Sequence, residues 1–323
     1  MHQHHHPAAP SQPRTPARRT SLADEENFRL ITGFNDIFVV IACLLLLIAA
    51  VWLAWEVKPW LAGMLGAALS WGLAEFFVRR RRMALPAIVL LLTFVMSFAL
   101  SVIAIANGAQ TFDLNRLQDG GTIGAIGVFS ALAAWLHWRR FKVPITVAAG
   151  ASALAGCVAE LLALWLPETL VMFTSGAGLL AWALYWDARD PQRKTRRADV
   201  AFWLHMAAAP LIVNPLFTVI GIFESDASAG VTLLALAVYL VLAMISLIID
   251  RRALMVSALG YVLYALISLI SKGDFNGSSF ALCALLMGGS LVLLAAFWQQ
   301  SRGALVRRLP DTLQKYLPPM VNA

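Results

Sequence analysis

The sequence has little charge. Asp, Glu, Lys and Arg make up 13% of its 323 residues, whereas 60% of the residues are apolar. Soluble domains carry about 25% charged and about 45–50% apolar residues, so this shortage excludes a soluble protein and also a disordered or fibrous one. Long apolar runs fill the chain instead, and they predict an all-α protein that crosses a membrane many times.

Strand signals are also missing, because polar and apolar residues do not alternate with a period of two. A spanning helix needs about 20 mostly apolar residues. Ten segments qualify: 36–55, 60–78, 83–106, 122–138, 143–166, 168–186, 200–223, 230–249, 253–270 and 279–298. The sequence therefore predicts a polytopic transmembrane bundle of ten helices at 34–299, after a tail at 1–33 and before an interfacial helix at 300–323.

Basic residues are nearly absent from alternate turns. Of the 25 Lys and Arg residues, only Lys58, Arg116 and Lys272 follow odd-numbered spans. The others lie near the two ends of the chain or after even-numbered spans, and the positive-inside rule then places both termini in the cytosol. Because every basic cluster adjoins an apolar run, the net charge of +7 predicts contact with anionic lipid rather than nucleic acid.

The two terminal segments are too polar to span a membrane. The first apolar run begins too late for a cleaved signal peptide, so it is predicted to be a retained helix. The tail before it is predicted to be disordered, with its four His residues as an alternative, weak metal-binding cluster. After the last span, Leu305, Leu309, Leu313 and Leu317 recur at intervals of four and predict a short helix lying on the inner leaflet.

Familiar catalytic patterns are absent from the sequence. Cys43, Cys157 and Cys283 stand singly within apolar runs, without the paired spacing of a zinc or redox site. There is no zinc-protease, phosphate-loop or dinucleotide-binding motif. Ser175 lies among small residues that more simply permit close helix packing. We therefore expect no enzyme activity, no cofactor and no metal.

Polar residues inside the spans are the candidate functional residues, because charge is costly in the bilayer. Glu160 follows Ala148, Ser152 and Gly156 at intervals of four, so all four share one helix face. Small residues mark helix contacts, which predicts a carboxylate that points into the bundle. Glu160 is then either a proton-binding site or a neutral side chain hydrogen-bonded between helices.

The seventh span holds a second group of candidates: His205, Asn214, Pro215 and Thr218. Its prolines, Pro210 and Pro215, remove helix hydrogen bonds, and broken helices recur at transporter binding sites. Asn214 and Thr218 share a face and are expected to contact a solute beside the opened backbone. His205 lies about half a turn away, so it joins this pocket only if Pro210 kinks the helix; otherwise it is a core histidine bonded to a neighbouring helix.

Residues near the inner ends of the spans have simpler interpretations. Glu75 lies four residues before Arg79, a spacing that predicts an ion pair at the surface. His137, beside Arg139, is expected at the membrane interface. Six tryptophans are expected to form an anchoring belt there rather than an aromatic cage: Trp71, Trp135, Trp138, Trp182, Trp186 and Trp298.

Two segments carry a resemblance to known proteins. RRADVAFWLHMAAAPLIVNPLF at 196–217 and DRRALMVSALGY at 250–261 resemble segments of uncharacterised proteobacterial inner-membrane proteins, over the C-terminal half of the chain. This resemblance implies a bacterial inner-membrane location and no particular activity. Ten spans joined by short loops also resemble the drug/metabolite transporter superfamily, in topology alone.

Two functions are consistent with these features. The first is transport of a small solute, coupled to a proton at Glu160, for which Glu160→Gln should abolish uptake while expression stays normal. The second is a non-catalytic scaffold or accessory subunit, whose basic loops and C-terminal helix bind lipid or a partner. For the scaffold, removal of residues 302–323 should matter and Glu160 should not.

Overall fold

A computed structural model describes residues 22–108, 120–223, 228–271 and 277–310, together with Gln314 and Leu317. These described residues form eleven α-helices and one short π-helical segment, η1. Their bounds are α1 Leu22–Trp55, α2 Pro59–Ala74, η1 Glu75–Arg80, α3 Ala84–Ala106, α4 Gly120–Phe141, α5 Ile145–Ala163, α6 Glu168–Ala188, α7 Arg196–Ile220, α8 Ala229–Ile249, α9 Ala253–Ser271, α10 Gly277–Ala296 and α11 Trp298–Val306. The predicted all-α membrane fold is confirmed.

Each of the ten predicted spans coincides with one of the helices α1 to α10. Among the described residues, the first eight of these helices, α2 together with η1, are long and apolar enough to cross a membrane. The described apolar parts of α9 and α10, Ala253–Ile267 and Met287–Ala296, are shorter. The structure therefore supports eight spans, and the full count of ten stays a prediction.

The two ends of the chain differ from the simplest expectation. Helix α1 begins at Leu22, so it includes the last part of the predicted tail, whose first 21 residues lie outside the described part. At the other end, α11 begins at Trp298 and ends at Val306. The expected leucine repeat extends beyond this helix, and Leu313 lies outside the described residues.

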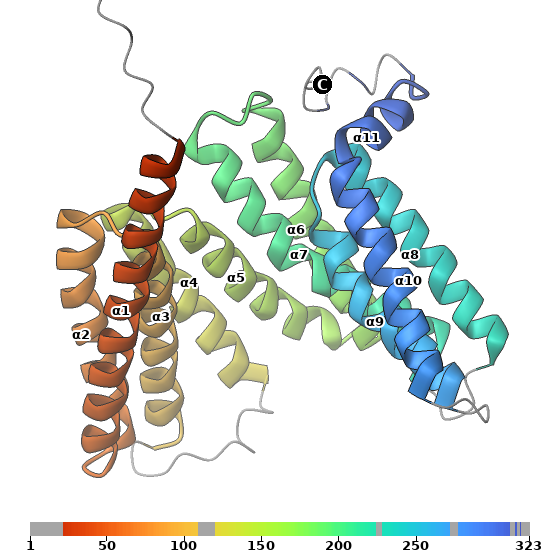
Figure 1. Cartoon of the computed structure of the whole chain (residues 1–323). Helices are drawn as coiled ribbons and strands as arrows, with labels where there is room; N and C mark the ends of the chain where they lie inside the picture. Colours follow the sequence, from red (N-terminus) through yellow and green to blue (C-terminus); the bar gives the residue numbers. More distant parts are fainter. Residues whose placement is uncertain are drawn as a thin grey trace, which may run out of the picture.

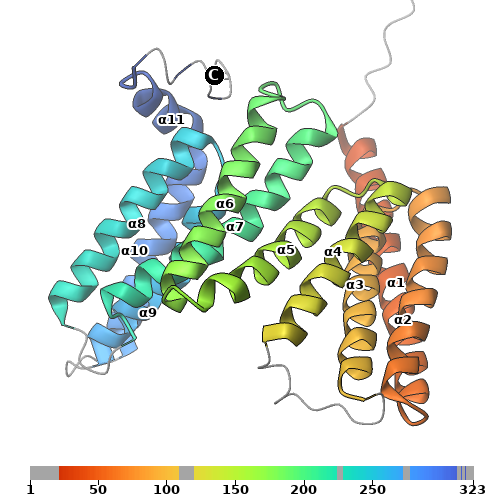
Figure 2. The same cartoon turned by 180° about the vertical axis from the view of Figure 1, so that it is seen from behind.

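The helices form two groups joined by α5. Helices α1 to α4 lie on one side and α6 to α11 on the other, with α5 between them (Figures 1 and 2). We call these groups the first and second lobes. Helix α5 packs against α4 of the first lobe and against α6 and α7 of the second, so it connects the lobes through side-chain contacts as well as through the chain.

The basic turns gather at one end of the bundle. The turns that follow α2, α4, α6 and α8 all lie at the end where α11 is found (Figure 1), which we call the basic end. Each of these turns contains a non-glycine residue in the left-handed conformation: Arg82, Lys142, Arg193 and Asp250, with φ between 53° and 59°. Such residues are uncommon and cost stability.

Helix α7 is the centre of the second lobe and the most buried of the long helices. Its buried residues include Leu204, Ala208, Val213 and Phe217, and the Phe217 ring stacks on Tyr261 of α9 at 5.1 Å between ring centroids. Helix α6 packs along α7. The core of this lobe is therefore built around the helix that carries most of the predicted site residues.

Candidate functional site

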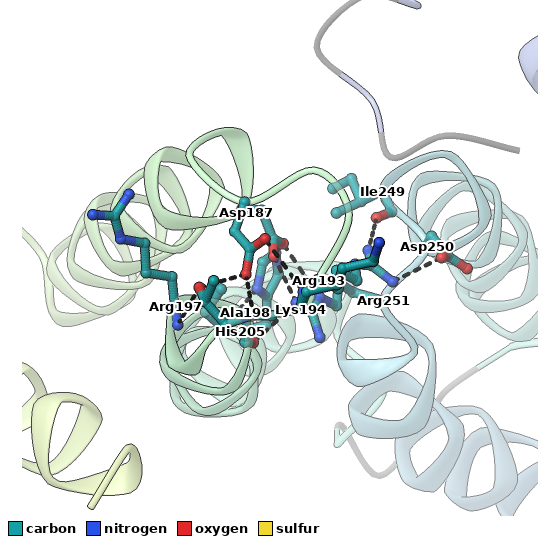
Figure 3. A network of polar contacts seen from close by, with 12 residues as sticks. Asp187, Arg193, Lys194, Arg197, Ala198, His205, Ile249, Asp250 and Arg251 are labelled. Atoms are coloured by element: carbon teal, nitrogen blue, oxygen red, sulfur yellow. Dashed lines mark hydrogen bonds and ion pairs between the residues drawn. The ribbon is translucent and has the colours of Figure 1, made fainter. Parts of the chain in front are cut away.

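A network of buried charges connects the helices at the basic end. Its centre is Asp187, in the last turn of α6, which accepts two hydrogen bonds from Arg251 in the turn between α8 and α9, at 2.6 and 3.2 Å. The same guanidinium donates to the carbonyl oxygen of Ala198 in α7, at 3.1 Å. Figure 3 shows these side chains meeting between the helices. One arginine thus connects α6 and α7 to the α8–α9 turn, in the paired geometry that strengthens such bonds.

Asp250 is the second centre of the network. Arg193 donates to its Oδ2 at 2.7 Å and to the carbonyl oxygen of Ile249 at 3.1 Å. From α11, the indole nitrogen of Trp298 donates to Oδ1 at 2.7 Å, and the Nε atom of the buried Arg302 lies 3.9 Å from the same oxygen. Asp250 therefore fixes both the α6–α7 turn and the start of α11 to the end of α8.

This arrangement corrects the expected role of Trp298. Its side chain is only 5% exposed, and Arg252 stacks over its ring at 4.7 Å. The predicted tryptophan belt is therefore wrong for this residue, because a hydrogen bond to a carboxylate outweighs the preference of an indole for the headgroup region. Trp135 and Trp182, by contrast, are exposed, as anchors require.

His205 of α7 faces Asp187. Its Nδ1 lies 2.7 Å from the carbonyl oxygen of Ala201, and because a carbonyl can only accept, Nδ1 carries the proton. The other nitrogen, Nε2, lies 3.7 Å from Oδ2 of Asp187, and it has no hydrogen-bond partner among the described residues. In neutral His205 a lone pair therefore faces a carboxylate, whereas a proton added to Nε2 would give the imidazole a charged partner.

Asp190 organises the turn between α6 and α7. Its carboxylate accepts from the hydroxyl of Thr195 at 2.6 Å and from the backbone N–H groups of Thr195 and Lys194 at 2.8 and 3.3 Å. The Thr195 hydroxyl in turn accepts from the N–H of Arg197 at 3.2 Å and caps α7. The hydroxyl bond is the main reason that the pKa of Asp190 is lowered below its ordinary value of 3.8, because hydrogen bonds to a carboxylate favour the ionised form.

Arg193 lies in the same turn and is surrounded by other charges. Burial is the main cause that lowers the pKa of its guanidinium, and the nearby Arg251 acts in the same direction. Asp250 and Asp187 oppose this shift. The network therefore holds several cations close together, and its carboxylates offset their repulsion.

The remaining predicted residues of α7 lie further along the helix. The side-chain amide of Asn214 donates to the Tyr261 hydroxyl of α9 at 3.0 Å. The hydroxyl of the exposed Thr218 donates to the backbone carbonyl oxygen of Asn214 at 2.9 Å. Pro215 is buried. The structure brings Asn214 and Thr218 together as predicted, but it places His205 with Asp187 and not with them.

The prolines do not break α7, which runs without interruption from Arg196 to Ile220. The expected break is therefore wrong, and α6 packs closely against this stretch. A Cβ atom added at Gly176 would lie 2.9 Å from the backbone nitrogen of Ile212, which shows how near the two backbones approach. The prediction that the small residues around Ser175 permit close helix packing is thereby confirmed at Gly176.

Glu160 lies near the end of α5. Its side chain is half-buried, and the described residues provide it with no hydrogen bond or ion pair. Ser152 and Gly156 are exposed, and a Cβ added at Gly156 would meet nothing within 4 Å. The predicted helix contact is therefore wrong for these two residues, because α5 packs through other faces. The role of Glu160 stays a prediction.

In the first lobe, Glu75 and His137 lie near the predicted inner ends of their helices. The Glu75–Arg79 ion pair is confirmed at 3.3 Å, and Arg140 of α4 adds a second pair at 2.5 Å. His137 is not interfacial, because it is fully buried. It packs on the Phe141 ring at 4.5 Å within a cluster of aromatic side chains that also holds Trp71.

Sequence reasoning missed Asp187, Arg193, Asp250 and Arg251 as a group. A signal was present, since both acids end apolar runs and lie next to basic turns at the same predicted face of the membrane. Within the described residues, no group of three or more His, Cys, Asp or Glu side chains is placed to hold a metal ion. Comparison with protein-family models, with curated proteins and with solved structures gives no match.

Proposed function

We propose that this multi-pass membrane protein is an inner-membrane transporter of a small solute, and that the His205–Asp187 pair binds the coupling proton. The observation that supports this most directly is the unpartnered Nε2 atom of His205, which lies 3.7 Å from a carboxylate in a buried network. Ionisable groups buried in membrane helices commonly mark proton pathways.

Protonation of His205 would change the contacts of its neighbours. Asp187 accepts two hydrogen bonds from Arg251, and a charged imidazole would compete with that arginine for the same carboxylate. Arg251 also donates to Ala198, so a weaker Asp187–Arg251 pair would loosen the α8–α9 turn from both α6 and α7. Proton binding would thus change how α6 and α7 pack against α8 and α9. A transport cycle between two conformations requires a change of this kind.

Asn214, Thr218 and the region around Pro215 are proposed as solute contacts further along α7. The side-chain carbonyl of Asn214 is directed toward Thr218, with a distance of 3.5 Å between Oδ1 and the Thr218 hydroxyl oxygen. Glu160 is retained as the competing proton site. Substitutions can separate the two candidates, because His205 lies beside Asp187, whereas Glu160 lies on α5 and has no ion pair among the described residues.

Proton coupling can be tested without knowing the solute. Inverted membrane vesicles with an imposed pH gradient would be supplied with a panel of inorganic anions, carboxylates, amino acids and organic cations. We expect at least one compound to dissipate the gradient only in vesicles that contain the protein. His205→Gln and Asp187→Asn should abolish this response. Arg189→Gln should preserve it, because Arg189 is exposed and its guanidinium stacks on Tyr185, outside the network.

Each alternative has its own outcome. Loss of the response in Glu160→Gln, with a normal response in His205→Gln, would move the proton site to α5 and overturn this assignment. A wild-type protein that is silent across the whole panel would contradict transport and favour the scaffold. In that case removal of residues 302–323 should impair the cell while Glu160→Gln does not.

A further inference from the structure

A cleft opens between the two lobes at the basic end. Its volume is about 730 Å³, within the range of about 300–1,000 Å³ that is usual for small-molecule sites. Its walls come from the end of η1, the start of α3, the α4–α5 turn and the first two turns of α7. It is separate from the His205 network and contains none of the residues discussed above as solute contacts.

Positive charge dominates the cleft wall. Four cations line it, Arg79, Arg82, Lys142 and Arg196, against the single carboxylate of Asp199. Arg79 is already paired with Glu75, and Lys142 lies over the Trp138 ring at 5.4 Å. Arg82 and Arg196 have no ion-pair partner among the described residues, so two guanidinium groups are available to an anion.

The backbone at two of these cations is strained. Arg82 and Lys142 both have φ of 55°, a conformation that favours glycine over long side chains. The cost is of order 1–3 kcal/mol for each such residue. Strained residues often occur at functional sites, and here both strained side chains line the same cleft.

Apolar and aromatic side chains complete the lining of the cleft. They include Ile88, Phe141, Phe202 and Trp203, and the rings of Phe202 and Trp203 lie 5.3 Å apart in an edge-on arrangement. We propose that this cleft binds an amphipathic anion, whose phosphate or carboxylate group contacts Arg82 and Arg196 while its apolar part lies against these rings. Identification of this anion as the transported solute rests on the proposed function; the binding itself does not.

Helix α7 lies between the cleft and the proton site. Arg196, Asp199 and Trp203 are spaced by three and four residues, so they share one face of the helix. His205, nine residues after Arg196, lies on the opposite face, toward Asp187. An anion bound in the cleft and a proton bound at His205 would therefore act on the same segment of α7 from its two sides.

The binding test uses the purified full-length chain and two named probes. Decyl phosphate carries the required charge and chain, and decyltrimethylammonium is its matched cation. We expect decyl phosphate to raise the melting temperature in a saturable way and the cation not to.

The double substitution Arg82→Gln/Arg196→Gln should weaken the affinity for decyl phosphate at least about tenfold, the loss expected for one charge-assisted hydrogen bond. Arg81→Gln is the control, since Arg81 belongs to the same turn but contacts the Phe76 ring outside the cleft.

A second experiment identifies the source of the anion. In phosphatidylcholine nanodiscs, decyl phosphate would compete with added phosphatidic acid or with inorganic phosphate. If phosphatidic acid displaces decyl phosphate, the natural ligand of the cleft is a membrane lipid. If it does not, the natural ligand is a soluble amphiphile. Both outcomes support the site. Equal binding of the two decyl probes, or wild-type affinity in the double variant, would overturn it. Normal binding together with a silent vesicle assay would contradict the proposed transport and leave the cleft assignment intact.

Discussion

At the scale of single residues, Asp190 shows how one carboxylate can determine a turn. It accepts hydrogen bonds from the hydroxyl and backbone N–H of Thr195 and from the N–H of Lys194. These bonds position the Thr195 hydroxyl, which caps α7. The turn that it organises also carries Arg193, whose guanidinium reaches Asp250. A small local motif therefore positions one of the cations of the buried network.

The lowered pKa of Asp190 predicts how stability depends on pH. Because the folded-state pKa lies below the ordinary value of 3.8, the ionised form stabilises the fold at every pH above that value. This contribution is lost as the pH falls through the folded pKa. We expect Asp190→Asn to lower the melting temperature of the purified protein at neutral pH, and this difference from wild type to shrink below about pH 4. A difference that stays constant from pH 7 to pH 3 would contradict this.

Residue-scale features were predictable only when both partners lie close in the sequence. The Glu75–Arg79 pair follows from a spacing of four, but Arg140, which binds the same carboxylate, lies 65 residues from Glu75. Asp187 and Arg251 are separated by 64 residues. Such pairs depend on which helix ends meet in three dimensions, and no periodicity in the sequence encodes that information.

At the scale of helices, apolar run length determines where the elements lie, whereas packing determines their shape. Helix α3 was predicted at 83–106 and is found at Ala84–Ala106. Helix α7 has the expected position, yet it stays continuous through Pro210 and Pro215. Neighbouring helices can compensate for the hydrogen bonds that proline removes, and such compensation is invisible in the sequence of the helix itself.

Gly176 gives a direct test of the α6–α7 contact. An added Cβ would meet the Ile212 side chain at 2.8 Å and its backbone nitrogen at 2.9 Å, and a backbone atom cannot move aside easily. We expect Gly176→Ala to destabilise the fold by about 1–3 kcal/mol, the usual cost of overpacking. Thermal unfolding in detergent would measure this.

Gly178→Ala is the matched control for this substitution. Gly178 belongs to the same helix, and an added Cβ there would meet nothing within 4 Å. Because alanine favours the helical conformation, this variant should be as stable as wild type or slightly more stable. Equal destabilisation by both substitutions would show that the close approach of α6 and α7 is not the cause of the lower stability of Gly176→Ala.

At the scale of the whole molecule, the two lobes share one orientation. The turns after α2, α4, α6 and α8 lie together at the basic end (Figure 1). Within the first lobe the Arg140–Glu75 ion pair connects neighbouring helix ends, and within the second lobe the Arg193–Asp250 pair does so. The charge count over the turns predicted this arrangement, because inner and outer turns must alternate along a chain of spanning helices.

Reporter fusions can test the orientation. Reporters placed after Arg82 and after Arg193 should both show a cytosolic location, since both turns are strongly basic and lie at the same end of the bundle. A reporter at Lys58, in the turn between α1 and α2, should show the opposite location. Opposite locations for the two basic turns would contradict the topology.

The four left-handed residues at the basic end imply a trade-off for the molecule as a whole. Glycine would adopt the conformations of Arg82, Lys142, Arg193 and Asp250 without strain, yet each position keeps a charged side chain. Two of these side chains line the cleft and two form an ion pair in the buried network. Replacement by glycine would relieve the backbone strain, but it would also remove the cleft cations or the Arg193–Asp250 ion pair.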